Sequence, residues 1–336
     1  MTIGIIGLGL MGEGRAKNIQ EVYPDADISI LTKRIEWEAA GPCTTLVQDE
    51  DAFFEHRHDV YFITNETYKH ADTLRRCLAL RPRGIFVEKP LSHTREGLEA
   101  LRAEVTAQGI VCVVGYSLQF FPPLIELQRI IRSGELGGLH SMHVSVGKDV
   151  RGTRSLPASA QYSHSAHTGG GAILDYIHEL NYPGWLLGEE ISFVAGGYGC
   201  TRLAIDAEDM AESIFQSKSG VLISIHQDYL QTPGKRSCEV RGPHGTVLFS
   251  RVLRPGSREN ELRIDTKEGT RTLPIEAGGS DRYMAELQSF MAHVQAGDGF
   301  TNLDEAIRDL QNVEIFKEKG VRLAPASGKG GNVPQP

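Results

Sequence analysis

The sequence has no apolar run long enough to cross a membrane, no Cys-x-x-Cys pair and no surplus of positive charge. A transmembrane helix needs about 20 predominantly apolar residues, so we expect no membrane partner. The net charge of -8 disfavours nucleic acid as a partner. The five cysteines are an odd number without metal-ligand spacing, which favours free thiols, a cytoplasmic location and no metal site.

What the sequence does contain is a regular alternation of apolar runs and helix-period segments up to about residue 117. The first run lacks a basic region before it, so we expect a β-strand there and not a secretion signal. Strands that alternate with helices predict right-handed βαβ units and a parallel sheet covered on both faces. The apolar runs are TIGIIG, DISILT, DVYFIT, GIFVEK and IVCVVG.

The pattern changes after residue 118, where helices lead into strands with alternating polar and apolar residues. The segments KSG and GPHG are typical of hairpin turns, which predicts an antiparallel or mixed sheet with one face partly open. We therefore predict a doubly wound α/β domain in residues 1–118 and an α+β domain in residues 119–325. Residues 326–336 are rich in Gly and Pro, and we expect a loose tail there.

A glycine-rich turn follows the first predicted strand and opens a helix. Its glycines are Gly7, Gly9 and Gly12, with Leu10 and Met11 between the last two. In this position the pattern predicts a dinucleotide site, because glycines permit a tight turn and a close backbone approach to a pyrophosphate at the helix N-terminus. The alternative is a glycine-rich turn without a ligand.

The end of the second predicted strand indicates which dinucleotide is bound. A site selective for NAD usually has an acidic residue there, which holds the ribose 2′-hydroxyl and repels a 2′-phosphate. This sequence has Thr32, Lys33 and Arg34 instead. A hydroxyl and two cations favour NADP(H), while NAD(H) stays open because both cations could be solvated. The missing acid also disfavours S-adenosylmethionine.

The fourth of these apolar runs, GIFVEK, ends in an unusual step, Glu88-Lys89-Pro90. Ligands of doubly wound sheets lie beyond the carboxyl ends of the strands, so these residues reach the place where a nicotinamide could lie. A lysine in a partly dry site has a lowered pKa and can exchange a proton with a carbon–oxygen centre. The alternative is a surface lysine. The sequence does not decide whether the Lys89–Pro90 bond is cis or trans.

A second group of polar residues lies in GGGAILDYIHELNY. Asp175 and His178 are three residues apart, which places them on one face of a continuous helix. A histidine that a carboxylate orients is a good general acid–base. The alternative is a structural hydrogen bond between the two side chains.

The sequence thus contains a series of motifs in a fixed order: GIIGLGLMG, NETYKH, FVEKPLS, VVGYSLQFFPPL, SGELG and GGGAILDYIHELNYPGWLLG. In order and spacing they resemble the Gfo/Idh/MocA oxidoreductases, nearly from end to end. The resemblance implies a Rossmann domain and a second domain with a large open sheet, whose flat face commonly forms homodimers or homotetramers. It implies NAD(P)-dependent hydride transfer at a hydroxyl of a small sugar-like substrate: a sugar, cyclitol or nucleotide sugar.

The resemblance also implies roles for individual residues. Lys89 would contact the reacting oxygen, and His178 with Asp175 would be the acid–base pair beside it. Many members have a spacing of four between these two residues, whereas this sequence has three. Both spacings keep the pair on one side of a helix, so we keep the roles and do not assume the common geometry.

Three further residues would lie at the cofactor. Asn65 and His70 match a loop that lines the cofactor in the family, and Glu88 would lie near the nicotinamide ribose. Glu66 departs from the pattern, because the family usually has proline at this position.

The substrate contacts are the least constrained part of the site. Gln119 stands where the family often has an arginine that could meet an acidic substrate group. The polar segment before the glycine-rich helix contains the candidates Arg151, Arg154 and Tyr162, since loops on a rigid scaffold carry specificity. Further candidates at a strand end are His226, Asp228 and Tyr229.

Two other functions stay open at this point. One is a catalytically silent NAD(P)-binding sensor or regulator, which some relatives of the family are. The other is a reductase of a non-sugar ligand such as a tetrapyrrole or an imine. Intact Lys89, Asp175 and His178 argue against the sensor, and the polar segment argues against the apolar ligand.

Overall fold

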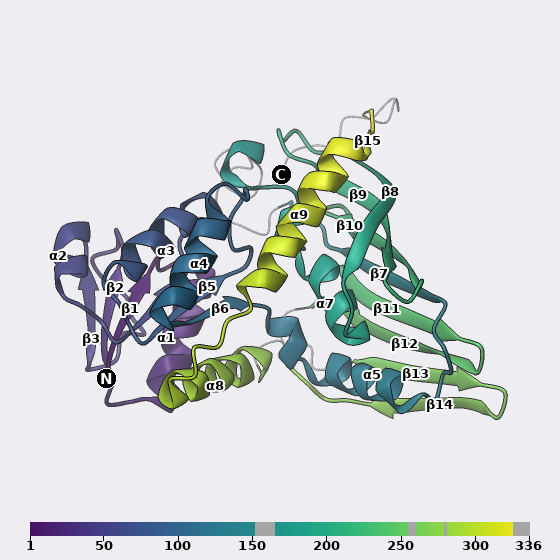
Figure 1. The fold of residues 1–336 in the computed structure, drawn as a ribbon, viewed down its shortest axis with the longest axis horizontal. Coiled ribbons are helices and arrows are strands. Elements are labelled where there is room, and N and C mark those ends of the chain that lie inside the picture. Colours follow the sequence, from purple (N-terminus) through teal and green to yellow (C-terminus); the bar gives the residue numbers. More distant parts are fainter. Residues whose placement is uncertain (152–164, 255–259, 279–280, 325–336) are drawn as a thin grey trace.

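The computed structural model describes residues 1–151, 165–254, 260–278 and 281–324. It has a parallel sheet in the amino-terminal part and a larger mixed sheet in the carboxyl-terminal part (Figure 1). The predicted fold class, an α/β domain followed by an α+β domain with a large open sheet, is confirmed.

Six parallel strands form the first sheet, in the order β3-β2-β1-β4-β5-β6. The strands are β1 (Thr2–Ile6), β2 (Asp27–Leu31), β3 (Thr44–Val47), β4 (Val60–Ile63), β5 (Gly84–Glu88) and β6 (Val111–Gly115). The helices are α1 (Leu10–Val22), α2 (Glu50–Glu55), η1 (Thr67–Lys69), α3 (His70–Leu78) and α4 (Leu98–Gln108). The strand order reverses between β1 and β4, which is where such sheets bind their ligands.

Five of these strands correspond to the predicted apolar runs. The sixth, β3, was not predicted, because it is a four-residue edge strand whose side chains are half-exposed or exposed. The inner strands β4 and β5 are buried along their whole length, as continuous apolar runs require in a sheet covered on both faces.

Nine strands form the second sheet, in the order β14-β13-β12-β11-β7-β10-β9-β8-β15. Two neighbouring pairs, β7–β10 and β8–β15, are parallel, and the other pairs are antiparallel. The strands are β7 (Ser141–Gly147), β8 (Ile191–Gly199), β9 (Met210–Ser217), β10 (Leu222–Asp228), β11 (Lys235–Gly242), β12 (Gly245–Val252), β13 (Glu261–Thr266), β14 (Gly269–Pro274) and β15 (Val321–Arg322).

In the described part of the chain, helices cover one face of the second sheet and leave the other face open (Figure 1). Strand β7 shows the consequence, since Met142 and Val144 are buried while His143 between them is exposed. The helices of this part of the chain are η2 (Ser117–Phe120), α5 (Pro122–Ser133), η5 (Ala166–Thr168), α6 (Ala172–Asp175) and α7 (His178–Leu187). The alternation follows from the two-residue period of a strand.

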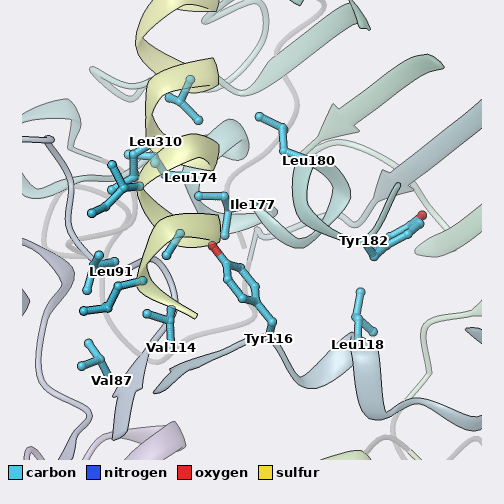
Figure 2. Packing of buried hydrophobic residues seen from close by; sticks show 14 of the residues in the cluster. Val87, Leu91, Val114, Tyr116, Leu118, Leu174, Ile177, Leu180, Tyr182 and Leu310 are labelled. Atoms are coloured by element: carbon cyan, nitrogen blue, oxygen red, sulfur yellow. The ribbon is translucent and has the colours of Figure 1, made fainter. Parts of the chain in front are cut away.

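The last two helices, α8 (Asp281–Ala296) and α9 (Leu303–Lys319), return to the first sheet. Phe290 of α8 packs edge-on against Phe62 and Phe86, each with ring centroids 5.5 Å apart. A Cβ on Gly84 would lie 2.5 Å from the side chain of Val294, so this close packing requires glycine. Leu310 of α9 belongs to a core that contains residues of both sheets (Figure 2).

Within the described residues, we find no helix that combines the length and the apolar character needed to span a membrane.

Candidate active site

The three glycines after β1 serve three different purposes. Gly7 has a φ of +100°, and a Cβ there would lie 2.8 Å from the backbone of Asn65. A Cβ on Gly12 would lie 2.1 Å from the carbonyl oxygen of Gly7, so α1 packs this closely only with glycine. Gly9 is the N-cap of α1 and has open space where a side chain would be. An uncapped helix start beside open space fits a pyrophosphate.

The first residues of α1 support the same interpretation. The side chain of Leu10 is 84% exposed, although it is apolar, and Met11 is half-buried. Among the described residues, no side chain caps the N-terminus of α1. An exposed leucine at an uncapped helix start is consistent with a surface that a dinucleotide covers.

The polar residues after β2 interact with α1. The hydroxyl of Thr32 accepts a hydrogen bond from the backbone amide of Arg34 at 3.2 Å. Arg34 Nη1 lies 2.6 Å from Glu13 Oε1, and both side chains are partly exposed. Glu13 has no local signal in the sequence, because its partner lies 21 residues away in the loop after β2. Lys33 is close enough to Glu66 to help lower the pKa of that carboxyl, together with the hydrogen bond from Lys69 and against the effect of burial.

The loop after β4 is braced against the segment that follows β5. His70 is buried, and its two ring nitrogens contact the carbonyl oxygens of Pro90 at 2.8 Å and Asn65 at 3.0 Å. The side-chain amide of Asn65 donates to Thr73 Oγ1 at 2.9 Å. Burial lowers the pKa of His70. His70 therefore holds the backbone around Lys89 and Pro90 in place, and this backbone role was not evident from the sequence.

Glu88 lies in the interior between β5, α1 and α8. Its carboxylate accepts a hydrogen bond from Arg15 Nε at 2.8 Å, and the same guanidinium donates to Glu286. The guanidinium carbon lies 4.4 Å from the centroid of the Phe86 ring. The side chain of Glu88 is 7% exposed. Neither Arg15 nor Glu286 has a local signal in the sequence, because both depend on the return of α8 to the first sheet.

Lys89 points the other way, toward the second domain. The bond between Lys89 and Pro90 is cis. Lys89 Nζ donates to the backbone carbonyl of Asp175 and lies 3.4 Å from Asp175 Oδ1. The other carboxylate oxygen of Asp175 accepts a hydrogen bond from the hydroxyl of Tyr229 at 3.2 Å. The structure thus brings together two predicted catalytic residues that are 86 positions apart, and adds Tyr229 to them.

Asp175 and His178 do not share one continuous helix, and that prediction is wrong. The chain forms α6 and α7 as separate helices, with Tyr176 in a non-helical conformation at the end of α6. A Cβ on Gly171, the N-cap of α6, would lie 2.3 Å from the buried Glu208, so the glycine-rich segment is pressed against another part of the chain. The break between Asp175 and His178 is a feature of the folded chain that their spacing in the sequence does not reveal.

His178 is buried at the start of α7. Its ring contacts Tyr116 edge-on with centroids 6.1 Å apart, and its Nδ1 atom has no hydrogen-bond partner among the described residues. Burial and the nearby cations Lys89, Arg236 and Arg282 hold its pKa well below the usual value. The imidazole is therefore neutral at neutral pH and is able to accept a proton.

A buried ion pair lies next to His178. Arg236 of β11 binds Glu179 with 2.6 Å between Nε and Oε1, and the Glu179 side chain is completely buried. Burial raises the pKa of Glu179, although Arg236 opposes this effect. The pair places a cation beside the imidazole, and it was not evident from the sequence because its partners are 57 residues apart.

Gln119 contacts other protein side chains. Its amide nitrogen donates to Asn181 Oδ1 at 3.0 Å and to Glu305 Oε1 at 2.8 Å. Asn181 in turn donates to Asp309 Oδ2 at 2.9 Å. Burial and the neighbouring carboxylate of Glu305 raise the pKa of Asp309 to about 7. In Figure 2 the hydroxyl of Tyr116 points toward α9, which carries both acids.

The remaining substrate candidates are only partly described. Arg151 pairs with Asp149, with 2.8 Å between Nη2 and Oδ2, and its side chain is 61% exposed. Arg154 and Tyr162 lie outside the described residues. In the described part of the chain, His, Cys, Asp and Glu side chains do not gather in threes in a way that could hold a metal ion.

The N-terminus of α1 is suited to bind a pyrophosphate, and a lysine lies beside a neutral histidine. Together these features are typical of an oxidoreductase of the NAD-binding Rossmann class. Comparison with known families agrees: residues 1–116 match the oxidoreductase family with an NAD-binding Rossmann fold. Residues 124–248 match the GFO/IDH/MocA C-terminal domain. The chain belongs to the Gfo/Idh/MocA oxidoreductase family, and the resemblance inferred from the motifs is confirmed.

Relatives and solved structures resemble the chain over nearly its whole length. Inositol 2-dehydrogenase 2 of Saccharopolyspora erythraea is 26% identical, with 97% of this chain and 96% of the relative covered. Myo-inositol 2-dehydrogenase of Thermotoga maritima is 23% identical, with 89% of each covered. KijD10, a 3-ketoreductase from Actinomadura kijaniata solved with NADP and TDP-benzene, has a TM-score of 0.82 at 19% identity, covering 96% of this chain and 98% of that one. This last likeness concerns the fold.

Proposed function

We propose that this protein transfers a hydride between nicotinamide C4 and a hydroxyl or keto carbon of a sugar, cyclitol or nucleotide sugar. The observation that carries the proposal is the position of Lys89, whose amine is held by Asp175 close to a buried, neutral His178 at the carboxyl end of β5. The inositol dehydrogenases among its relatives support the same class of reaction.

In the proposed mechanism, NAD(P) supplies or accepts the hydride. During oxidation the substrate carbon loses its hydride, its hydroxyl loses a proton, and a carbon–oxygen double bond forms. The proton passes to His178, which is neutral and therefore has a free ring nitrogen. Lys89 Nζ donates a hydrogen bond to the same oxygen and stabilises the negative charge that develops on it. Reduction runs through the same groups in reverse.

Asp175 and Tyr229 hold the amine of Lys89 in this mechanism. Asp175 uses its backbone carbonyl and one carboxylate oxygen for Lys89 and its second oxygen for Tyr229. The side chains of Lys89 and Asp175 are 21% and 33% exposed, so a substrate can reach them. Because the amine of Lys89 is held in place, its N–H groups point at one substrate oxygen. Lys89 therefore orients the substrate and also polarises its carbon–oxygen bond.

The activity is tested with purified protein, both redox states of the cofactor, and a panel of inositols, sugars and nucleotide sugars. We expect turnover with at least one member of the panel. Cofactor binding without any turnover would instead indicate a catalytically silent sensor. Turnover restricted to a tetrapyrrole or an imine would replace the proposed substrate class.

We propose NADP(H) as the preferred cofactor, because Thr32, Lys33 and Arg34 follow β2 where an NAD-selective site has an acid. Charge-assisted hydrogen bonds contribute about 1.5–3 kcal/mol each, which corresponds to roughly 10- to 100-fold in affinity. In fluorescence titrations we expect tighter binding of NADPH than NADH, and loss of that difference in a Lys33→Ala/Arg34→Ala variant. Equal affinities that the variant leaves unchanged would mean that Lys33 and Arg34 are solvated surface charges, and would contradict a preference for NADP(H).

We also propose that the open face of the second sheet assembles the protein into a homodimer or homotetramer in the cytoplasm. The face extends over neighbouring strands such as β7 and β10, and among the described residues it is not covered by the helices that pack on the opposite side (Figure 1). The five cysteines are free, which suits a reducing compartment. Sedimentation at several concentrations measures the assembly, and a monomer at all of them would contradict it.

A further inference from the structure

A histidine on the open face of the second sheet is held between two carboxylates. His226 of β10 has Nδ1 at 2.6 Å from Glu212 Oε2 and Nε2 at 2.9 Å from Asp228 Oδ2. Carboxylates accept hydrogen bonds and do not donate them, so both ring nitrogens must carry a proton to make the two bonds. We call Glu212, His226 and Asp228 the outer clasp.

The surroundings of the outer clasp favour the charged imidazole. In the sheet register, Glu212 of β9 and Ser145 of β7 lie opposite His226, and Asp228 is two residues further along β10. The charged groups that act on His226 are Asp228 and Glu212. Their hydrogen bonds raise the pKa of His226 to about 9 against the effect of burial. The clasp is therefore closed at neutral pH.

Asp228 connects the outer clasp to the turn that follows β10. Its second carboxylate oxygen accepts hydrogen bonds from the backbone amides of Leu230 at 2.6 Å and Gln231 at 2.7 Å. The backbone amide of Tyr229 is held by the carbonyl oxygen of Asp209 at 2.9 Å. One carboxylate thus joins the charged histidine on one side to the turn on the other.

The same turn carries Tyr229 to the opposite face of the sheet. Tyr229 is 1% exposed, and its hydroxyl donates to Asp175 Oδ2 at 3.2 Å. Asp175 in turn holds the amine of Lys89. A continuous series of contacts therefore runs from the open face, through the turn, to the amine that the proposed mechanism uses.

We propose that His226 is a positioning residue: clamped between Glu212 and Asp228 on the outer face, it fixes the turn that places Tyr229 on Asp175 and thereby aims Lys89. The effect of His226 on turnover rests on the proposed function. The contacts of the outer clasp are a structural property, which can be measured without any substrate. Substrate need not touch the outer clasp for the clasp to affect the reaction.

The structural part is tested by hydrogen–deuterium exchange of residues 229–232 in a His226→Gln variant. The charged imidazole donates from two opposite sides of its ring, one to each carboxylate, and the neutral amide of glutamine cannot do this. We therefore expect the amides of Leu230 and Gln231 to exchange about tenfold faster or more in the variant. The matched control is His143→Gln on β7 of the same open face, where His143 contacts Ser224 at 2.6 Å outside the clasp. We expect this control to leave residues 229–232 unchanged.

The pH dependence of this exchange gives a second readout. Because the pKa of His226 is raised in the folded protein, the stability that the clasp contributes is complete below the ordinary histidine pKa and is lost as pH rises through about 9. After correction for intrinsic exchange, wild-type protection of residues 229–232 should fall across this range. The His226→Gln variant should show no such step. Equal protection in wild type and variant at every pH would overturn the clasp.

The functional part is tested by a double-mutant cycle with Tyr229→Phe. We expect His226→Gln to lower kcat about tenfold in the wild-type background while NADPH affinity stays unchanged. In the Tyr229→Phe background the same change should lower kcat less than twofold, because the connection to Asp175 is already broken. Equal losses in both backgrounds, or full activity of the single variant, would overturn the positioning role. If wild type turns over no substrate, the proposed function fails and the exchange experiment still decides the clasp.

Discussion

Two ionic centres begin at adjacent residues of one dipeptide and differ in almost every other respect. Glu88 joins Arg15 and Glu286 in what we call the sealed centre, whose side chains are 7%, 1% and 1% exposed. Lys89 joins Asp175 in the half-open centre, whose side chains are 21% and 33% exposed. A strand sends successive side chains to opposite faces, so one dipeptide supplies both centres.

The two centres use the same types of residue, but the difference in burial gives them different roles. The sealed centre stabilises the fold, and the half-open centre is available to a substrate. In the sealed centre, removal of one partner leaves a charge without compensation and out of reach of water. In the half-open centre, water can replace a lost partner, so the fold tolerates the loss while the reacting oxygen loses its donor. The two centres should therefore respond to mutation in different observables.

Replacement of Lys89 by Met should have the largest effect, and that effect should be on turnover. In the proposed mechanism Lys89 stabilises the negative charge that develops on the reacting oxygen, and loss of one such donor lowers kcat by about 100- to 1,000-fold, so we expect a fall in this range. The melting temperature should not change, because Lys89 is partly solvated. Steady-state kinetics and a thermal melt measure both. Lys218→Met, which breaks an exposed pair with Glu190, is the control and should keep full activity. A Lys89 variant with wild-type turnover would refute the mechanism.

Replacement of Arg15 by Met should instead act on stability. Glu88 and Glu286 would be buried without their common cation, and loss of one partner of a buried pair lowers the free energy of unfolding by about 3–5 kcal/mol. Urea denaturation measures the change. The control is Arg75→Met, whose exposed pair with Asp72 should contribute less than about 1 kcal/mol. Similar values for the two variants would remove the distinction between the centres.

Asp309, which lies in neither centre, provides a pH-dependent test of the difference between buried and solvated charges. Its pKa is raised to about 7 in the folded protein, so the stability it contributes is complete at about pH 4 and is lost as pH rises through 7. Asp309→Asn should therefore gain stability relative to wild type between pH 4 and pH 8, by about 2–4 kcal/mol. Chemical denaturation at several pH values measures this. Asp304→Asn, at an exposed position of the same helix, should show no such trend.

The smallest effect is expected at the exposed pair between Glu13 and Arg34. Glu13→Gln releases Arg34 for a 2′-phosphate, and because exposed pairs are worth about 0–1 kcal/mol, NADPH should bind at most about fivefold more tightly. NADH binding should not change. Glu21→Gln, on an exposed position of the same helix, is the control for net charge. Weaker NADPH binding by the Glu13 variant would mean that Glu13 holds Arg34 in place for the phosphate.

Much of the fold followed from local patterns. The apolar runs predicted five of the six strands of the first sheet, and β3 escaped because a short edge strand has little apolar character. Of the candidate site, the glycine turn and Lys89 were recognisable because each depends on its immediate neighbours. The separation of α6 from α7 was not, since it accompanies the packing of Gly171 on Glu208.

Local sequence patterns were enough to predict the class of sheet, the turn at Gly7 and the importance of the Glu88-Lys89 dipeptide at which both ionic centres begin. These features depend on periodicity and on allowed φ angles, which act over a few residues. Long-range packing, in contrast, brings Arg15 to Glu88 and Glu286, brings Asp175 to Lys89, and places His226 at the outer end of the series of contacts that leads to Lys89. Those outcomes depend on side chains up to 271 positions apart, whose approach is set by how helices and sheets pack.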